Sequence, residues 1–144
     1  MVYRLTRRTH DLFQADSHQF TLDVLKAAED IYGPNAPEKL LYNVFKKKTA
    51  ALKSKAKGET VSDRAKWLAH VRDGEGYMAQ FINNGKDGGP HILECHSPIL
   101  NLVEHYPIIG RFEQDMFEAV LGSRVRREVI RNSGLYECAF QFVV

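Results

Sequence analysis

In the segment VRREVIRNSGLYECAFQF, residues 125–142, side chains of similar kind tend to recur at every second position, on both sides of Asn132-Ser133-Gly134. Such alternation is typical of a β-strand whose two faces differ, and Asn, Ser and Gly are favoured in tight turns. The segment therefore predicts an antiparallel hairpin, with strands at 125–131 and 136–142, that closes the chain.

Two more strands and two helices are predicted before this hairpin. Residues 77–83 and 91–95 also follow a period near two, and the NGKDGG segment at 84–89 between them is a hairpin-type loop. Residues 98–105 begin with a proline, which the first turn of a helix tolerates. Residues 109–121 carry apolar side chains at helical spacing. The C-terminal half thus predicts an antiparallel sheet of about four strands with two interposed helices.

The N-terminal half predicts helices at 17–33, 35–57 and 62–73; Gly33-Pro34 ends the first, and Gly58 and Gly74 follow the other two. Residues 3–6 alternate between apolar and polar side chains, as a short strand would. The whole pattern indicates an α+β fold, in which N-terminal helices precede the sheet. The apolar face expected on the first helix consists of Phe20, Val24, Ala28 and Ile31.

The helix at 35–57 is longer than a small domain needs, at roughly 33 Å. Leu41, Val44, Phe45 and Leu52 follow helical spacing along it. One part of this face can serve the domain core while the neighbouring part contacts a second subunit. The sequence therefore predicts a homodimer formed through the helical half.

Composition narrows the class of protein. The chain has 144 residues, a formal net charge of +2 and two cysteines. That charge is too small to indicate a polyanionic partner by itself. No apolar run approaches the ~20 residues needed to span a bilayer, and the N-terminal residues lack the apolar core of a secretory signal. We expect a cytoplasmic protein without a membrane segment, whose cysteines are not a disulfide framework.

Several segments resemble motifs of one bacterial regulator family, in the same order and at similar spacing. They are Tyr3-Arg4-Leu5-Thr6 with Leu12-Phe13, Glu75-Gly76-Tyr77-Met78-Ala79 ("GYLA"), Ser97-Pro98-Ile99 ("CPI"), Glu113 to Phe117 ("ExxxF"), Leu121-Gly122 with Val125 and Arg127 ("LGxxVxR"), and Gly134, Cys138 and Phe140 ("GxxxCxY"). The family is that of the winged-helix repressors related to the iron–sulfur cluster assembly repressor, grouped with DeoR- and ArsR-like proteins.

This resemblance implies a regulatory domain of a transcriptional regulator that dimerises and can bind a small-molecule effector. Residues 1–16 correspond to a remnant of the wing strand and linker, and 17–144 to the effector and dimerisation domain. The recognition helix has no counterpart here, so DNA would be contacted only through an attached winged-helix domain.

Cofactor binding is not expected. The resemblance places two cluster-ligating cysteines of the family at Ser97 and Gly110, and only Cys138 matches a ligand position. A zinc site made by Cys95, His96, His105 and Cys138 is the alternative. Cys95 and His96 would point to opposite faces of a strand. The alternation of Cys138 with Tyr136 and Phe140 favours a small buried apolar residue over a metal ligand.

An effector site is predicted between the sheet and the helices that cover it. Arg127 shares a strand face with Val125 and Val129, so it either pairs with a ligand carboxylate or an internal acid, or lies on an exposed edge strand. A closed core made by the same aromatic residues is the other possibility. The predicted walls are Tyr77, Phe81, Phe112, Tyr136 and Phe140, and the predicted polar contacts are His96, Arg127 and Cys138.

Other functions have less support. Residues 46–57 carry six lysines and no acid. These lysines either bind DNA phosphates or form a solvated helix face that meets the acids of residues 104–118. The end of the chain also resembles V4R-like domains, which implies a stand-alone small-molecule or haem-type binding domain. No phosphate loop, nucleophile elbow or HExxH helix is present, so we do not expect an enzyme.

Overall fold

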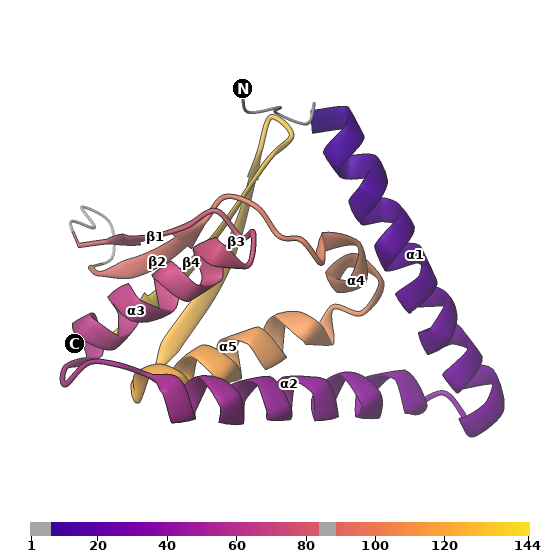
Figure 1. Cartoon of the computed structure of the whole chain (residues 1–144), viewed down its shortest axis with the longest axis horizontal. Helices are drawn as coiled ribbons and strands as arrows, with labels where there is room; N and C mark the ends of the chain where they lie inside the picture. The colour runs from indigo at the N-terminus through magenta and orange to yellow at the C-terminus, as the bar shows by residue number, and fades with distance from the viewer. Residues whose placement is uncertain (1–6, 84–88) are drawn as a thin grey trace.

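The computed structural model describes residues 7–83 and 89–144, with side chains from His18 onward except Asn132. It confirms the predicted α+β fold (Figure 1). The elements are α1 (Arg7–Tyr32), α2 (Ala36–Lys55), α3 (Val61–Gly74), β1 (Ala79–Ile82), β2 (His91–Glu94), α4 (Leu100–His105), α5 (Ile108–Leu121), β3 (Val125–Asn132) and β4 (Leu135–Phe142).

The strands form one antiparallel sheet in the order β1-β2-β4-β3. β2 pairs with β4, although α4, α5 and β3 lie between them in the sequence. Phe140 lies opposite Ile92 on one side and Arg127 on the other, and Cys138 lies opposite Glu94. Directly opposite residues point to the same face of a sheet. These five side chains therefore lie in two neighbouring rows on the one face of the sheet that the helices cover.

The helices cover this face in two layers. α3 contacts β1 and β2, α5 contacts β3, and the two helices contact each other. α2 then packs along α5 on the side away from the sheet, and the two run side by side (Figure 1). α1 lies at the edge of the molecule, where it contacts α2 and α4. None of the described helices is long and apolar enough to cross a bilayer.

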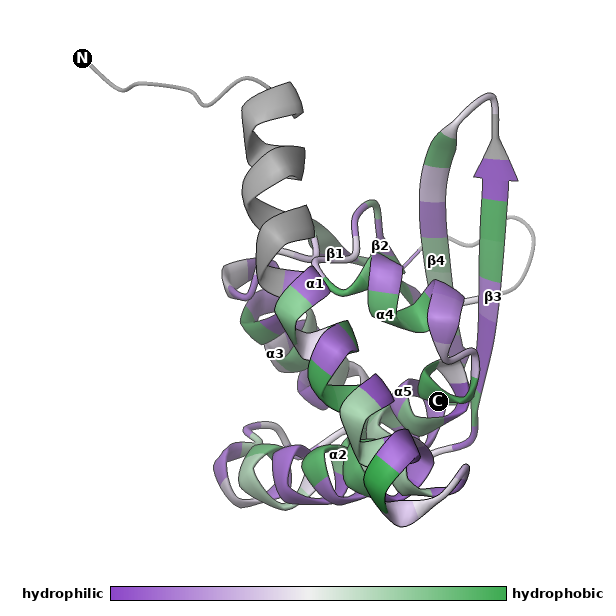
Figure 2. Ribbon diagram, turned by 90° about the vertical axis from the view of Figure 1, so that its right-hand side faces the viewer, coloured by the Kyte–Doolittle hydropathy of each residue, from purple (hydrophilic) through white to green (hydrophobic). Residues whose placement is uncertain are grey.

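The C-terminal hairpin forms as predicted. Ser133 and Gly134 both have positive φ, at 52° and 79°, and join β3 to β4 as a two-residue turn. Positive φ at both positions is the geometry that hairpins prefer. The hairpin extends beyond α4 and α5 (Figure 2). Ile130 and Leu135 near its tip are therefore exposed, at 42% and 60%.

Several predicted boundaries were wrong. α1 begins at Arg7, ten residues earlier than predicted, so the proposed boundary between residues 16 and 17 falls inside a continuous helix. The predicted strand at 3–6 and most of the loop at 84–89 lie outside the described residues. Tyr77 donates its backbone N–H to the carbonyl of Arg72, which closes the C-terminal end of α3, so Tyr77 lies in the connection to β1 and not in a strand. Met78 has a φ of 50°, so β1 begins only at Ala79.

The buried face of α1 also differs from the predicted one. Leu22, Leu25 and Ala28 face the core, with 2%, 5% and 8% of their surface exposed. Phe20 and Ile31, expected on the same face as Ala28, are 72% and 70% exposed. Helical spacing identifies an apolar stripe but not which of two stripes the core covers.

Arg64 of α3 fixes the end of α5. Its Nε and Nη2 atoms donate to the carbonyl oxygen of Leu121 at 3.0 and 2.8 Å. Helix C-termini leave carbonyl oxygens without intrahelical donors, so the guanidinium satisfies one of them. The next residue, Gly122, ends the helix in the left-handed conformation with a φ of 71°.

A Gly122→Ala substitution should destabilise the fold by about 1 kcal/mol, because a Cβ disfavours the left-handed conformation. Urea unfolding followed by circular dichroism measures this. Gly74→Ala is the matched control, since Gly74 has ordinary helical φ and open space at its Cβ. It should leave stability unchanged or raise it by up to about 1 kcal/mol. Equal losses of stability in both variants would contradict the left-handed conformation assigned to Gly122.

Candidate functional site

A buried ion-pair cluster lies between the sheet and the helices. Arg72 of α3 donates to both carboxylate oxygens of Glu94 on β2, from Nε at 2.6 Å and from Nη2 at 2.8 Å. The same Nη2 donates to Glu113 of α5 at 2.7 Å. All three residues are 2–3% exposed. A bidentate pair of this kind fixes orientation as well as distance, so Arg72 connects α3, α5 and the sheet.

Aromatic rings enclose the guanidinium of Arg72. Its central carbon lies 3.4 Å from the ring centroid of Tyr77 and 5.1 Å from that of Phe117. Phe117 in turn stacks on Phe140 of β4, with ring centroids 3.8 Å apart. A planar guanidinium stacks well on aromatic faces. The rings therefore exclude water from the charges and pack against them.

Arg127 of β3 is the second cation of the cluster. Its Nη2 lies 3.5 Å from Glu113, and its side chain is 14% exposed. Nε and Nη2 of Arg127 are buried without a hydrogen-bond partner among the described residues. A Cβ at Gly110 would lie 2.6 Å from Nη1, so glycine leaves the space this guanidinium occupies. Of the environments considered for Arg127, the structure shows the pairing with an internal acid.

Burial shifts the pKa values of the cluster and its neighbours. It raises the pKa of Glu94 to about 7, against the opposing effect of Arg72 and with the help of nearby Glu113. Burial also raises the pKa of the Cys138 thiol to about 12 and that of Tyr136 above its ordinary value. Cys138 is 1% exposed and is thus held as a neutral thiol among apolar residues.

The structure brings only some of the predicted site residues together. Tyr77, Arg127, Cys138 and Phe140 border the ion-pair cluster, which occupies the space where an effector was expected. Tyr136 also lies beside the cluster, since its side chain is hydrogen-bonded to that of Cys138 and interacts with Glu113 and Arg127. The others lie elsewhere: Phe81 stacks with Phe142, the half-buried His96 donates its backbone N–H to the carbonyl of Tyr77, and Phe112 contacts Tyr42 and Phe45.

The central residues of the cluster were not predicted from sequence. Arg72 lies in the last turn of an otherwise ordinary amphipathic helix, and Glu94 alternates with Ile92 on a strand. Glu113 was assigned to an acidic helix that could meet the lysines, but it faces the sheet. One signal was available: Glu94 takes the inward position of a strand whose other inward residue is apolar. A charge at such a position needs a buried partner.

The proposed zinc ligands do not form a site. Cys138 is buried, whereas His105 is exposed and its Nδ1 lies 2.9 Å from the carbonyl oxygen of Asn101. Among the side chains that the structure describes, no three of His, Cys, Asp or Glu are arranged to hold a metal ion.

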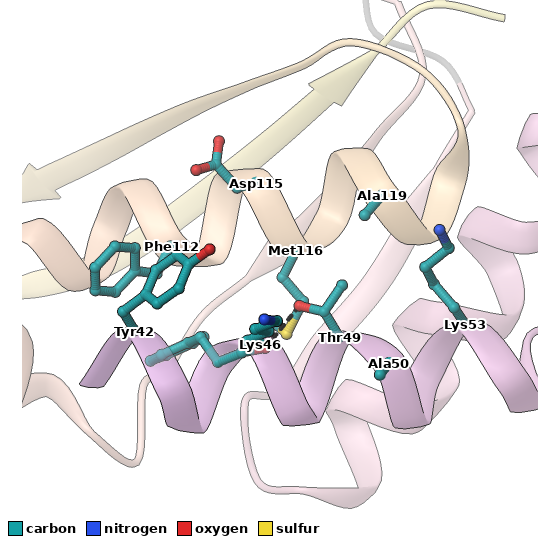
Figure 3. A pocket seen from close by; sticks show the side chains of 10 residues that line it. Tyr42, Lys46, Thr49, Ala50, Lys53, Phe112, Asp115, Met116 and Ala119 are labelled. Atoms are coloured by element: carbon teal, nitrogen blue, oxygen red, sulfur yellow. Dashed lines mark hydrogen bonds between the residues drawn. The ribbon is translucent and has the colours of Figure 1, made fainter. Parts of the chain in front are cut away.

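A groove lies on the other side of α5, between α5 and α2 (Figure 3). Its volume is about 380 Å³, within the range of ligand pockets, and it is open to solvent. Lys46 and Lys53 of α2 lie on one rim, and Asp115 of α5 lies on the other (Figure 3). Its apolar lining comes from Tyr42, Phe45, Ala50, Phe112, Met116 and Ala119.

A second, smaller cavity of about 160 Å³ lies beside the ion-pair cluster. Arg72 and Tyr77 line it together with Phe45, Lys48 and Leu52 of α2. This volume is below the ~300 Å³ typical of metabolite pockets. The groove is therefore the more capacious of the two surfaces for a partner or ligand.

Comparison with known proteins adds no family assignment, since no protein-family model and no curated protein sequence matches this chain. The resemblance to winged-helix regulators thus rests on the quoted motifs. Residues from four of those motifs, namely Tyr77, Glu113, Phe117, Arg127, Cys138 and Phe140, lie in or beside the ion-pair cluster.

Replacing Arg72 with Met should destabilise the protein strongly, by roughly 3–5 kcal/mol, because two buried carboxylates would lose their shared cation. Urea unfolding at neutral pH measures the loss. Arg131→Met is the control, since Arg131 and its partner Glu104 are 56% and 48% exposed. That variant should lose less than about 1 kcal/mol. Similar small losses in both would show that the cluster contributes little to stability.

Stability should also depend on pH through Glu94. The pKa of Glu94 is about 7 in the folded chain and about 4.5 ordinarily, so the folded state binds more protons between these values. The free energy of unfolding should therefore fall as pH rises from about 4.5 to 7. Glu94→Gln removes this titration, and its unfolding curves should show a weaker dependence across that window. An identical pH profile in both proteins would rule out the shift.

Proposed function

We propose that this chain is the regulatory domain of a winged-helix transcriptional regulator and that it dimerises through its helical half. The single observation that carries the proposal is the uncovered apolar stripe of α1. Phe20 and Ile31 are 72% and 70% exposed, and Val24 between them is 48% exposed. Tyr32 next to this stripe is 80% exposed.

A row of large apolar side chains on one helix face is characteristic of an interaction surface. α1 already buries a separate face, formed by Leu22, Leu25 and Ala28, against its own domain. The second stripe is thus not needed for folding of the single chain. A helix with one stripe for its own core and another for a partner is what a dimerising domain requires.

The motif residues support the regulator class. Segments that are far apart in the sequence, and that were matched to one family by residue type alone, contribute neighbouring side chains to one buried cluster. In this proposal the domain contacts no DNA sequence by itself, and an attached winged helix does so.

A stand-alone small-molecule binding domain of the V4R-like kind is the second candidate. The observation that favours it is the groove between α2 and α5, whose volume and aromatic lining suit an apolar ligand with an anionic group. An effector of the regulator would also bind in this groove, because the ion-pair cluster fills the space between the sheet and the helices.

Dimerisation can be tested with a double substitution in α1. The wild-type chain should sediment as a dimer at micromolar concentration, and Phe20→Asp/Ile31→Asp should sediment as a 16.5 kDa monomer with an unchanged circular dichroism spectrum. Charges on the stripe would have to be desolvated in an interface. Leu135→Asp at the hairpin tip, where Leu135 is 60% exposed, is the matched control and should remain dimeric. A monomeric wild type would overturn the proposal.

A further inference from the structure

We propose that the apolar stripe of α1 binds in the α2–α5 groove of a second copy of this chain. The inference rests on the proposed dimer and names its two contacting surfaces. The stripe consists of Phe20, Val24 and Ile31, and the groove is the one lined by Tyr42, Phe45, Phe112 and Met116. A helix with an apolar face placed in an apolar groove is a recurring mode of recognition.

The two surfaces match in length. The stripe extends from Phe20 to Ile31, which is eleven residues along α1. The groove follows α2 from Tyr42 to Lys53, which is also eleven residues. At 1.5 Å per residue, each is about 16 Å long. The whole stripe can therefore lie within the groove.

The two surfaces also match in charge. Asp23 and Asp30 are exposed, and they are seven residues apart. Seven residues return to nearly the same side of a helix, so both carboxylates flank the apolar stripe. Asp23 also accepts a hydrogen bond from Gln19, one turn earlier, at 3.0 Å. Lys46 and Lys53 are likewise exposed, seven residues apart and on one rim of the groove.

These spacings set the orientation of the bound helix. Two carboxylates about 10 Å apart on α1 face two ammonium groups about 10 Å apart on α2. Asp115 belongs to the α5 side of the groove, so like charges disfavour the acidic flank there and favour the lysine rim. Every copy carries one stripe and one groove, so a two-fold axis can satisfy both contacts at once in a closed dimer.

Charge reversal with rescue tests this arrangement by sedimentation equilibrium of the full chain. Asp23→Lys/Asp30→Lys should raise the dimer dissociation constant at least roughly tenfold, and Lys46→Glu/Lys53→Glu should do the same. The quadruple variant that combines all four changes should dimerise nearly as well as the wild type. All four side chains are exposed, so the fold should be retained, which circular dichroism and urea unfolding verify.

A matched quadruple variant provides the control. It combines Asp23→Lys/Asp30→Lys with Lys47→Glu/Lys55→Glu, whose lysines are exposed on the same helix but do not line the groove. It has the same net charge as the first quadruple variant. It should dimerise as weakly as Asp23→Lys/Asp30→Lys. Rescue by both quadruple variants would show a net-charge effect and overturn the inference.

The remaining outcomes separate the inference from the proposed function. A wild-type dimer that Phe20→Asp/Ile31→Asp dissociates, but that the charge variants leave intact, would place the α1 contact elsewhere and overturn only the inference. A monomeric wild type would overturn both. Native mass spectrometry showing a small molecule on the wild-type chain, lost in Lys46→Glu/Lys53→Glu, would assign the groove to a ligand and overturn the inference.

Discussion

The shared hydrogen bonding of Arg72 to Glu94 and Glu113 is the constraint on which the rest of the structure depends. An unpaired charge cannot be buried without a large loss of solvation free energy, so these three side chains must meet. Their positions are fixed on α3, β2 and α5. Once they meet, the position of α3 and of α5 over the sheet is restrained at this point. Apolar packing alone tolerates small shifts that a bidentate ion pair does not.

The cluster also explains features that packing alone leaves unexplained. Gly110 lies inside α5, where alanine would favour the helix more, yet a Cβ there would collide with the guanidinium of Arg127. Tyr77 departs from the strand alternation expected of it because its ring covers Arg72 from the end of α3. These local departures from regular patterns are the requirements of one buried site.

The order and type of the elements could be predicted from sequence, because period two and period 3.6 depend only on neighbouring residues. The C-terminal hairpin was the most accurate case, since its alternation extends over both sides of the turn and Gly134 readily adopts the positive φ found there. The pairing of β2 with β4 and the ion-pair cluster could not be predicted, because they join residues such as Arg72 and Glu113 from distant segments. The exposed face of α1 was missed for a similar reason: Phe20 and Leu22 are both apolar, and only the tertiary structure decides which is covered.

α5 connects the cluster with the surface available to a partner. Its inner face carries Glu113 and Phe117, which contact Arg72, and its outer face carries Phe112 and Asp115, which line the groove. Arg64 fixes the C-terminal end of the same helix through the Leu121 carbonyl. Energetic coupling between two sites needs a physical element that both of them contact. A partner in the groove would contact α5, which is held against α3 by the Arg72–Glu113 ion pair and by the hydrogen bonds from Arg64 to the Leu121 carbonyl. If the proposed dimer forms through this groove, these contacts favour movement of α3, α5 and the sheet as one body over a rearrangement of the core.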